Sequence, residues 1–477
     1  MPFINIVNIA LLTLFLLIGS ASTVASDTGR KVAKPHSKPN IILILADDMS
    51  WFDVGSYHQR FNNLPKNAIT PNIDKIASEG MLFTRSFTSS AMCAPTRMQL
   101  YTGIYPVRNG AYGNHTRVYE GVKSAAHYFR ELGYRVGISG KGHIFPHKAF
   151  PFERSGKANN GPEGESSFGI QPTRKFMSRN KKQPFFLVIA SANPHLPWNR
   201  GDTDLYPPNK LELPVFLNDT PRLRDRLSQY LAEVSDLDSE VGLIDDEIDK
   251  LGIKNDTILI FTSEQGSSLP FGKWTNYDAG LRNTFIIRCP DKIAANVTTD
   301  AMVEYVDVVP TLTDLASSTI PKDLDGRSFK AVLQGDATEH KTHVFGVQTS
   351  LNIHHGAPYP IRSVRSEEFK LIHNLLPENN FSNILTGDSW FKDELTEEKK
   401  ASNDNYAGYV KRPEFELYNV IKDPFEQNNI ISAPQYSRQV AALKKELSQW
   451  MQQQGDLGIA TEMSVCDRKG FNNKGCD

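Results

Sequence analysis

Two pairs of oxygen-bearing side chains follow apolar runs that are typical of buried strands. Asp47 and Asp48 follow the run PNIILILA at residues 39–46. A second apolar run ends directly before Glu264 and Gln265. Adjacent carboxylates repel each other unless a cation lies between them, and hard oxygen ligands suit Ca²⁺ or Mg²⁺. The pattern therefore predicts a divalent cation site, although either pair taken alone is also compatible with an ordinary solvated turn.

A cysteine in segment 90–103, which reads SAMCAPTRMQLYTG, introduces a different chemistry. Cys93 is followed by Pro95, Thr96 and Arg97. This order resembles the Cys-x-Pro-Ser/Thr-Arg signature of the sulfatases, a family in which the cysteine is oxidised after translation to formylglycine. The resemblance implies that a hydroxyl of the hydrated aldehyde, held by a metal, is the nucleophile. It also implies that Arg97 fixes the site and counters its negative charge.

Further segments match sulfatase landmarks in the expected order. Segment 140–143, Gly-Lys-Gly-His, resembles the Gly-Lys-x-His element of the family, and segment 193–197 resembles its Pro-His-x-Pro element. Segment 262–266 stands where the family usually has Thr-Ser-Asp-Asn/His-Gly, and Lys273 follows at the position of a second basic residue. The resemblance runs from Pro39 to about residue 451, which is nearly the whole chain after the first residues.

The resemblance implies a role for each of these side chains. Lys141 and Lys273 would bind sulfate oxygens, as cations do in phosphoryl transfer. His195 would protonate the departing sugar oxygen or nitrogen, and His143 would take a proton from the second hydroxyl at position 93. The implied catalytic residues are Cys93, Arg97, Lys141, His143, His195 and Lys273, and the implied ligands of one Ca²⁺ are Asp47, Asp48, Cys93, Glu264 and Gln265.

Within the family, the chain is most similar to the sulfamidase (heparan N-sulfatase) branch and to bacterial polysaccharide sulfatases. Segments 109–113, 255–257 and 359–364 carry this likeness. Two departures, Glu264 for aspartate and Gln265 for asparagine or histidine, keep oxygen ligands but weaken any transfer of the exact substrate. We expect exo-type removal of sulfate from fragments of ulvan, carrageenan, fucan or heparan. The candidate substrate-binding residues are His115, His354, His355, Arg362 and Arg365.

Three alternatives remain open. One is an N-sulfoglucosamine sulfohydrolase, that is, a sulfamidase. A phosphatase or phosphodiesterase of the same superfamily would normally carry Ser or Thr at position 93 and use two metals. A non-catalytic glycan-binding protein has no reason to keep Cys93, Arg97, Lys141 and His195 together.

The elements that must position these residues alternate between strand and helix. Apolar runs predict strands at 39–46, 134–139, 184–191 and 257–263. Such alternation indicates an α/β fold with a mostly parallel sheet between helices, in which ligands bind beyond the carboxyl ends of the strands. The resemblance implies the alkaline phosphatase-like version of that fold. Helical patterns lie between the strands, at 71–79, 122–132, 221–251 and 308–316.

The pattern changes near residue 344. Residues 361–373 alternate as antiparallel strands do, 377–411 is polar and predicts loops, and 437–451 predicts a terminal helix. We therefore expect a catalytic domain at 26–343 and a C-terminal subdomain at 344–477 that completes the substrate pocket.

The first residues have the pattern of an export signal. An apolar run at 9–18 precedes small residues that allow cleavage after Ala25, and it is too short to span a membrane. We predict a signal peptide at 1–25, no membrane span, and a secreted or periplasmic enzyme. Lys and Arg number 53 against 54 Asp and Glu, a formal net charge of −1, which argues against nucleic acid as a partner.

The four cysteines fit an exported protein without indicating a disulfide-dense scaffold. Cys466 and Cys476 bracket a polar tail, so a local disulfide is plausible there, whereas Cys289 follows an apolar run and predicts a buried thiol. Cys93 is the cysteine that the sulfatase resemblance uses. The expected partners are the sulfated oligosaccharide or polysaccharide substrate and a formylglycine-generating enzyme during maturation.

Overall fold

A large mixed sheet forms the centre of the fold in the computed structural model, which describes residues 38–161, 166–351, 356–398 and 406–468. Its strands are β1 (Asn40–Ala46), β2 (Met81–Phe87), β3 (Arg135–Gly140), β4 (Glu153–Arg154), β5 (Phe185–Ala190), β6 (Thr257–Ser263), β7 (Arg282–Arg288), β8 (Val297–Thr299) and β9 (Val303–Glu304). The order is β4-β3-β5-β1-β6-β7-β2-β8, with β9 beside β2. β7 is antiparallel to both of its neighbours, and the other pairings are parallel. The predicted mostly parallel sheet is confirmed.

The central strands are apolar on both faces because helices cover both faces. Ile42 of β1 pairs with Leu187 of β5 on one side and with Leu259 of β6 on the other, and all three are fully buried. Successive side chains of a strand point to opposite faces. Ile42 accordingly packs in one core, and the next residue, Leu43, packs in the other. This explains why these strands read as continuous apolar runs rather than as alternating ones.

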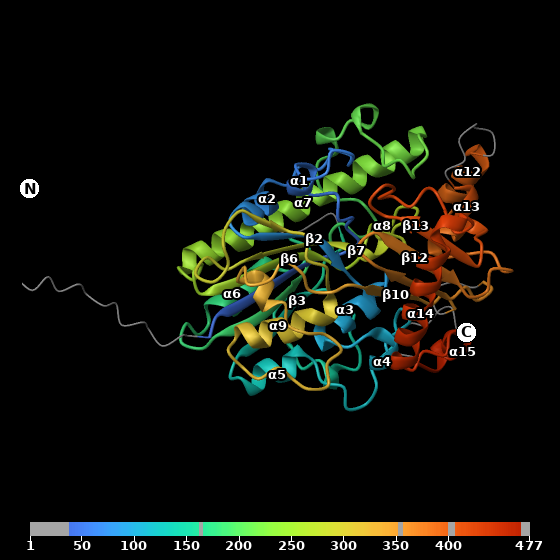
Figure 1. Cartoon of the computed structure of the whole chain (residues 1–477). Coiled ribbons are helices and arrows are strands. Elements are labelled where there is room, and N and C mark those ends of the chain that lie inside the picture. The colour runs from blue at the N-terminus through green and yellow to red at the C-terminus, as the bar shows by residue number, and fades with distance from the viewer. Residues whose placement is uncertain (1–37, 162–165, 352–355, 399–405, 469–477) are drawn as a thin grey trace, which may run out of the picture. The chain divides into compact units, whose positions relative to one another are not determined.

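The helices form two layers, each of which packs against one of these two cores (Figure 1). One layer consists of α1 (Gly55–His58), α2 (Pro71–Ser78), α6 (Ile170–Ser178) and α7 (Pro221–Leu251). The other consists of α3 (Cys93–Thr102), α5 (Ala125–Glu131), α9 (Val308–Leu315) and α10 (Lys330–Leu333). Two short helices, α4 (Pro106–Asn109) and α8 (Asp278–Leu281), lie in connections. Single 3₁₀ turns occur at His147–Ala149, Thr203–Leu205, Pro208–Lys210, Tyr305–Asp307, Pro434–Tyr436 and Val465–Arg468.

A second, antiparallel sheet follows in the chain, as predicted from the alternation at 361–373. It contains β10 (Val344–Gln348), β11 (Ile361–Arg365), β12 (Phe369–Asn374) and β13 (Phe415–Asn419), in that order. The helix α14 (Ser437–Gln454) packs Leu443, Leu447 and Trp450 against it. A short helix, α15 (Ile459–Met463), comes after α14, so the helix predicted at 437–451 is present and slightly longer but is not the last one.

The prediction of loops throughout 377–411 was wrong. This segment contains α11 (Ile384–Gly387), α12 (Ser389–Glu398) and α13 (Ala407–Val410). Phe391 of α12 is fully buried, and its ring centroid lies 5.3 Å from that of Tyr409. The segment is polar overall, but a few aromatic side chains are enough to dock short helices on the core.

The position of the predicted division at residue 344 coincides with the start of β10, and we keep the two-domain description as a proposal. The predicted signal peptide, His354, His355 and Cys476 lie outside the described residues. In the part of the chain that is described, no helix is both long and apolar enough to cross a membrane.

Candidate active site

The predicted site residues converge at one edge of the large sheet. Asp47 follows β1, Lys141 follows β3 and Glu264 follows β6, while His195 lies five residues beyond the end of β5. These four strands are adjacent, in the order β3-β5-β1-β6, and they run parallel, so their carboxyl ends meet at the same edge. Cys93 reaches this edge from the first residue of α3.

Cys93 lies close to both aspartates. Its Sγ is 3.9 Å from Asp47 Oδ1 and 4.0 Å from Asp48 Oδ1. One ligand atom from each of Asp47, Asp48, Cys93 and His195 lies within 4.8 Å of the others. Asp48 has a left-handed backbone, with φ 64°, a conformation that costs of order 1 kcal/mol or more and persists where the surroundings hold it. The site thus brings the Cys93 thiol and two carboxylates within one small volume.

Three cationic side chains lie next to this group. Lys141 Nζ makes an ion pair with Asp47 and lies 3.7 Å from Cys93 Sγ. Lys273 Nζ donates to Asp48 Oδ2 at 2.7 Å. Arg97 makes an ion pair with Glu264 through Nε. Together these cations could receive an anionic group of the substrate near Cys93.

The Arg97 guanidinium is also tied to other parts of the site. Its Nη1 donates to the backbone oxygen of Lys141 at 2.9 Å, and its Nη2 lies 3.6 Å from Asp47 Oδ1. The side chain is completely buried. Arg97 therefore joins the ends of β1, β3 and β6.

The electrostatic surroundings favour charged forms at the centre. Burial raises the pKa of the Cys93 thiol, but the ammonium groups of Lys141 and Lys273 outweigh it and hold that pKa well below its usual value. Burial also acts to raise the pKa of Asp47, and Lys141 and His195 hold it well below the usual value. Negative charge at positions 47 and 93 is thus stabilised by the flanking cations.

His195 presents one ring nitrogen to the site. Its Nδ1 lies 2.6 Å from the backbone oxygen of Leu196, to which it donates, so Nε2 is the atom that faces Asp48 Oδ2 at 3.6 Å. Burial and Lys141 lower the pKa of His195, but Asp48 and Asp47 raise it above its usual value. The ring is 28% exposed, whereas the aspartates are fully buried. A partly exposed imidazole that retains its proton is suited to meet a leaving group.

His143 contacts Cys93, and His115 lies next to it. The two ring centroids are 4.8 Å apart, and both residues have left-handed backbones, with φ of 50° and 62°. Burial lowers the pKa of His143 to about 4, although the Cys93 thiolate acts to raise it. The neutral imidazole favoured by this shift can accept a proton from a group at position 93.

The oxygen ligands fit a hard divalent cation. Gln265 Nε2 lies 2.5 Å from Asp48 Oδ1 and 3.7 Å from Cys93 Sγ. Its Oε1 is buried and has no hydrogen-bond partner among the described residues. Rotation of the amide by 180° would exchange the two atoms and direct Oε1 towards Asp48, as a cation there requires. Glu264 adds a carboxylate whose pKa is raised by burial, a cost that a cation would offset.

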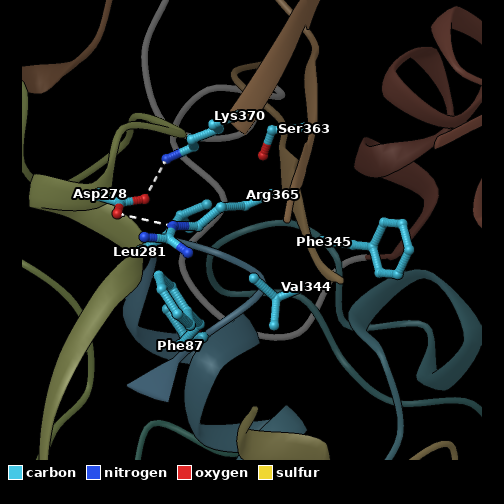
Figure 2. Close-up of a pocket in the computed structure, with 9 residues that line it drawn as sticks. Phe87, Asp278, Leu281, Val344, Phe345, Ser363, Arg365 and Lys370 are labelled. Carbon is cyan, nitrogen blue, oxygen red and sulfur yellow. Dashed lines mark hydrogen bonds and ion pairs between the residues drawn. The ribbon is translucent and has the colours of Figure 1, made fainter. Parts of the chain in front are cut away.

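Two of the predicted substrate-binding residues are used by the fold instead. Arg362 is fully buried, and its Nη2 lies 2.9 Å from Asp456 Oδ1. Arg365 Nε lies 3.0 Å from Asp278 Oδ2, and the same carboxylate accepts from Lys370 Nζ at 2.8 Å (Figure 2). The cavity beside Arg365 has a volume of about 10 Å³, room for a single water molecule. This placement does not support substrate binding by either arginine.

One contact of the site was missed in the sequence. Ser268 Oγ donates to Asp48 Oδ2 at 2.8 Å, beside the bond from Lys273. The serine lies in the segment between Gln265 and Lys273, so its position next to two predicted site residues was the available signal. His115, in contrast, is the predicted substrate contact that the structure brings next to the site.

Comparisons with known proteins agree on one family. The family model described as Sulfatase matches residues 39–318, and the model described as N-sulphoglucosamine sulphohydrolase, C-terminal, matches residues 266–385. The chain is 31% identical over 460 residues to an ulvan-active sulfatase of Formosa agariphila, covering 92% of this chain and 86% of that protein.

Two further similarities extend over most of the chain. It is 29% identical over 493 residues to the N-sulphoglucosamine sulphohydrolase of Homo sapiens, covering 90% of this chain and 93% of that protein. Among solved structures, one described as a complex with its substrate D-glucosamine-2-N,6-O-disulfate has a TM-score of 0.66 at 20% identity. That match covers 88% of this chain and 99% of the other, and at this identity it supports the fold.

Proposed function

The chain belongs to the sulfatase family of sulfuric ester hydrolases, and we propose that it removes sulfate from sulfated oligosaccharides. The observation that carries this proposal is the position of Cys93, within 4.0 Å of two aspartates and 3.7 Å from Lys141. A cysteine in an anion-binding site of this kind is suited to become the nucleophile position of sulfate transfer.

Two chemical groups complete the proposal. Formylglycine made from Cys93 would supply a hydrated aldehyde, and a Ca²⁺ held by Asp47, Asp48, Glu264 and Gln265 would supply positive charge for the sulfate oxygens and the nucleophile. The oxygen-rich ligand set and the unpartnered Gln265 Oε1 support a hard cation.

The remaining side chains divide the work of binding and proton transfer. Lys141 and Lys273 bind sulfate oxygens, since their ammonium groups flank Cys93 and Asp48. His195 donates a proton from Nε2 to the departing oxygen or nitrogen. His143 accepts a proton at position 93, consistent with its lowered pKa. Arg97 holds Glu264 and Asp47 in place.

The substrate class is proposed from the relatives. One is named for ulvan and another for N-sulphoglucosamine, and both align with about nine-tenths of this chain. We propose O-sulfated sugars of polysaccharide fragments as the substrate. The match of residues 266–385 to a sulphoglucosamine sulphohydrolase model favours a sulfamidase as the second candidate. We also propose export through the signal peptide at 1–25 and maturation by a formylglycine-generating enzyme.

A desulfation screen tests the proposal. Purified enzyme is incubated with defined O-sulfated and N-sulfated oligosaccharides and with matched phosphate esters, and released anions are measured by ion chromatography. Peptide mass spectrometry across residues 90–97 reports the state of Cys93. Sulfate release that follows the formylglycine fraction supports the proposal, and phosphate release in its place points to a phosphatase.

The Cys93→Ser variant is the matched control. Without a serine-specific maturase it should bind oligosaccharide but release no sulfate, because a sulfated serine has no second hydroxyl with which to expel the group. Full activity of protein whose Cys93 is wholly an unmodified thiol would exclude the formylglycine mechanism.

A further inference from the structure

The loop that carries His195 is held by one face of α7. Glu233, Asp236 and Glu240 of this helix are spaced i, i+3 and i+7, which places them on the same face. All three accept hydrogen bonds from residues 191–200. We call these three side chains the α7 carboxylate row.

Glu240 holds the start of the loop. Its Oε2 accepts from Ser191 Oγ at 2.7 Å, and Ser191 Oγ in turn accepts from the backbone N–H of Asn193 at 3.0 Å. The backbone oxygen of Asn193 accepts from the N–H of Asp47 at 2.9 Å. A continuous path of hydrogen bonds therefore runs from Glu240 to the acidic pair of the active site.

Asp236 holds both sides of His195 with a single oxygen atom. Its Oδ2 accepts from Asn193 Nδ2 at 2.8 Å and from Arg200 Nε at 2.7 Å. Asn193 lies two residues before His195 and Arg200 lies five residues after it. The two ends of the loop are thus joined through one carboxylate.

Glu233 holds the end of the loop through the backbone. Its Oε1 accepts from the N–H of Asn199 at 2.7 Å and from that of Arg200 at 3.1 Å. Within the loop, Trp198 Nε1 donates to the backbone oxygen of Pro194 at 2.9 Å, so the loop is also linked to itself next to His195.

This arrangement is expensive if its purpose is only stability. Glu233 and Glu240 are 1% and 3% exposed. Burying a carboxylate costs several kcal/mol, and its new contacts often do no more than offset that loss of free energy. Among the described residues, the ion pair that the row forms is that of Asp236 with Arg200. Apolar side chains could have packed the loop at lower cost, but they would not have fixed individual N–H groups.

We propose that the α7 carboxylate row positions His195 as the proton donor to the leaving group. The inference rests on the proposed function, in which His195 Nε2 delivers that proton. The ring is fixed to its own loop, because Nδ1 donates to Leu196, so the position of Nε2 follows the position of the loop. A misplacement of about 1 Å at a reacting group can cost on the order of 10²-fold in rate.

The test uses leaving groups of graded acidity. Aryl sulfates with acidic phenols need little help from a proton donor, whereas sugar and alkyl sulfates need it. The ratio of kcat for an aryl sulfate to kcat for a sugar sulfate therefore reports on His195. His195→Ala should raise this ratio by about 10²–10⁴-fold, the usual range for general acid catalysis.

Asp236→Ala is the decisive variant, since it removes one contact on each side of His195 at once. It should raise the same ratio by roughly 10-fold or more, with KM nearly unchanged, because a displaced donor is a partial loss of what His195→Ala removes. Asp236→Asn, which keeps one acceptor oxygen, should lie between Asp236→Ala and the wild type. It also allows the kcat ratio to be measured if the alanine variant does not fold.

Asp238→Ala is the matched control on the same helix. Asp238 is a buried carboxylate that accepts two backbone N–H groups, those of Asn72 at 3.2 Å and Ile73 at 2.8 Å, but it faces α2. Its loss should lower the melting temperature and leave the ratio within about twofold of the wild type.

The outcomes separate the two proposals. If His195→Ala raises the ratio and both Asp236 variants leave it unchanged, the α7 carboxylate row is structural and this inference is wrong, while the proposed function stands. An equal rise with Asp238→Ala has the same consequence. If His195→Ala itself leaves the ratio unchanged, His195 is not the proton donor, and both the inference and that part of the proposed function are overturned.

Discussion

Replacement of Arg97 by methionine tests how the active site balances its charges. The guanidinium is completely buried and contacts the carboxylates of Glu264 and Asp47 and the backbone oxygen of Lys141. Methionine fills similar space without charge, so two buried carboxylates lose a cation. Breaking a buried ion pair in this way typically costs about 3–5 kcal/mol.

The expected shift in melting temperature follows from the size of the protein. At about 2.1 cal/mol/K of unfolding entropy per residue, the roughly 440 residues from 38 onwards give about 0.9 kcal/mol/K. A loss of about 3–5 kcal/mol then lowers the melting temperature by about 3–5 °C. Sulfate release should fall by more than the folded fraction does, because the orientation of Glu264 and Asp47 is lost as well.

Arg362→Met is the matched control, since Arg362 is an equally buried arginine paired with a carboxylate, Asp456. It should lose a similar amount of stability but keep its activity per folded molecule and its KM. Calorimetry and sulfate release on both variants give the comparison. Unchanged stability in Arg97→Met, or a raised KM in Arg362→Met, would refute the reasoning.

Three other predictions follow from the described contacts. Asp48→Asn should lower Ca²⁺ content, measured by metal analysis, together with activity; full activity after exhaustive chelation contradicts a metal-dependent site. Burial raises the pKa of Glu240 to about 7, whereas the pKa in the unfolded chain is about 4.5. Between about pH 4.5 and pH 7 folding therefore takes up a proton, and the free energy of unfolding falls as the pH rises through this range. Glu240→Gln should remove about 2 kcal/mol of the fall in unfolding free energy between about pH 5 and pH 7. If the pH dependence of the unfolding free energy is unchanged in the variant, Glu240 does not titrate in this range. Leu187→Ala in the core should cost about 2–5 kcal/mol and leave the activity per folded molecule unchanged.

The large sheet was predictable because its strands carry their own signal. The strand predicted at 257–263 is β6 to the residue, and the one predicted at 39–46 is β1 with one residue more. Strands that are buried on both faces must be apolar throughout, which leaves short, continuous runs in the sequence. The second sheet was predictable from the alternation of apolar and polar side chains at 361–373, although the structure buries all five residues of β11.

Individual roles of charged residues were less predictable. Arg362 and Arg365 were expected to contact sugar, but their carboxylate partners, Asp456 and Asp278, lie 94 and 87 residues away in the chain. The helices within 377–411 were missed because their stability depends on aromatic contacts with distant segments, such as the packing of Phe271 on Tyr409.

By itself, the sequence determined the kinds of chemical group at the site and their place in the chain. Asp47, Cys93, Lys141 and Glu264 could be picked out because each belongs to a short local motif next to a strand or helix end. Only the tertiary structure decided which distant groups hold them. The spacing of Glu233, Asp236 and Glu240 is visible in the sequence, but their attachment to the His195 loop depends on how α7 lies against the sheet, which no local pattern encodes.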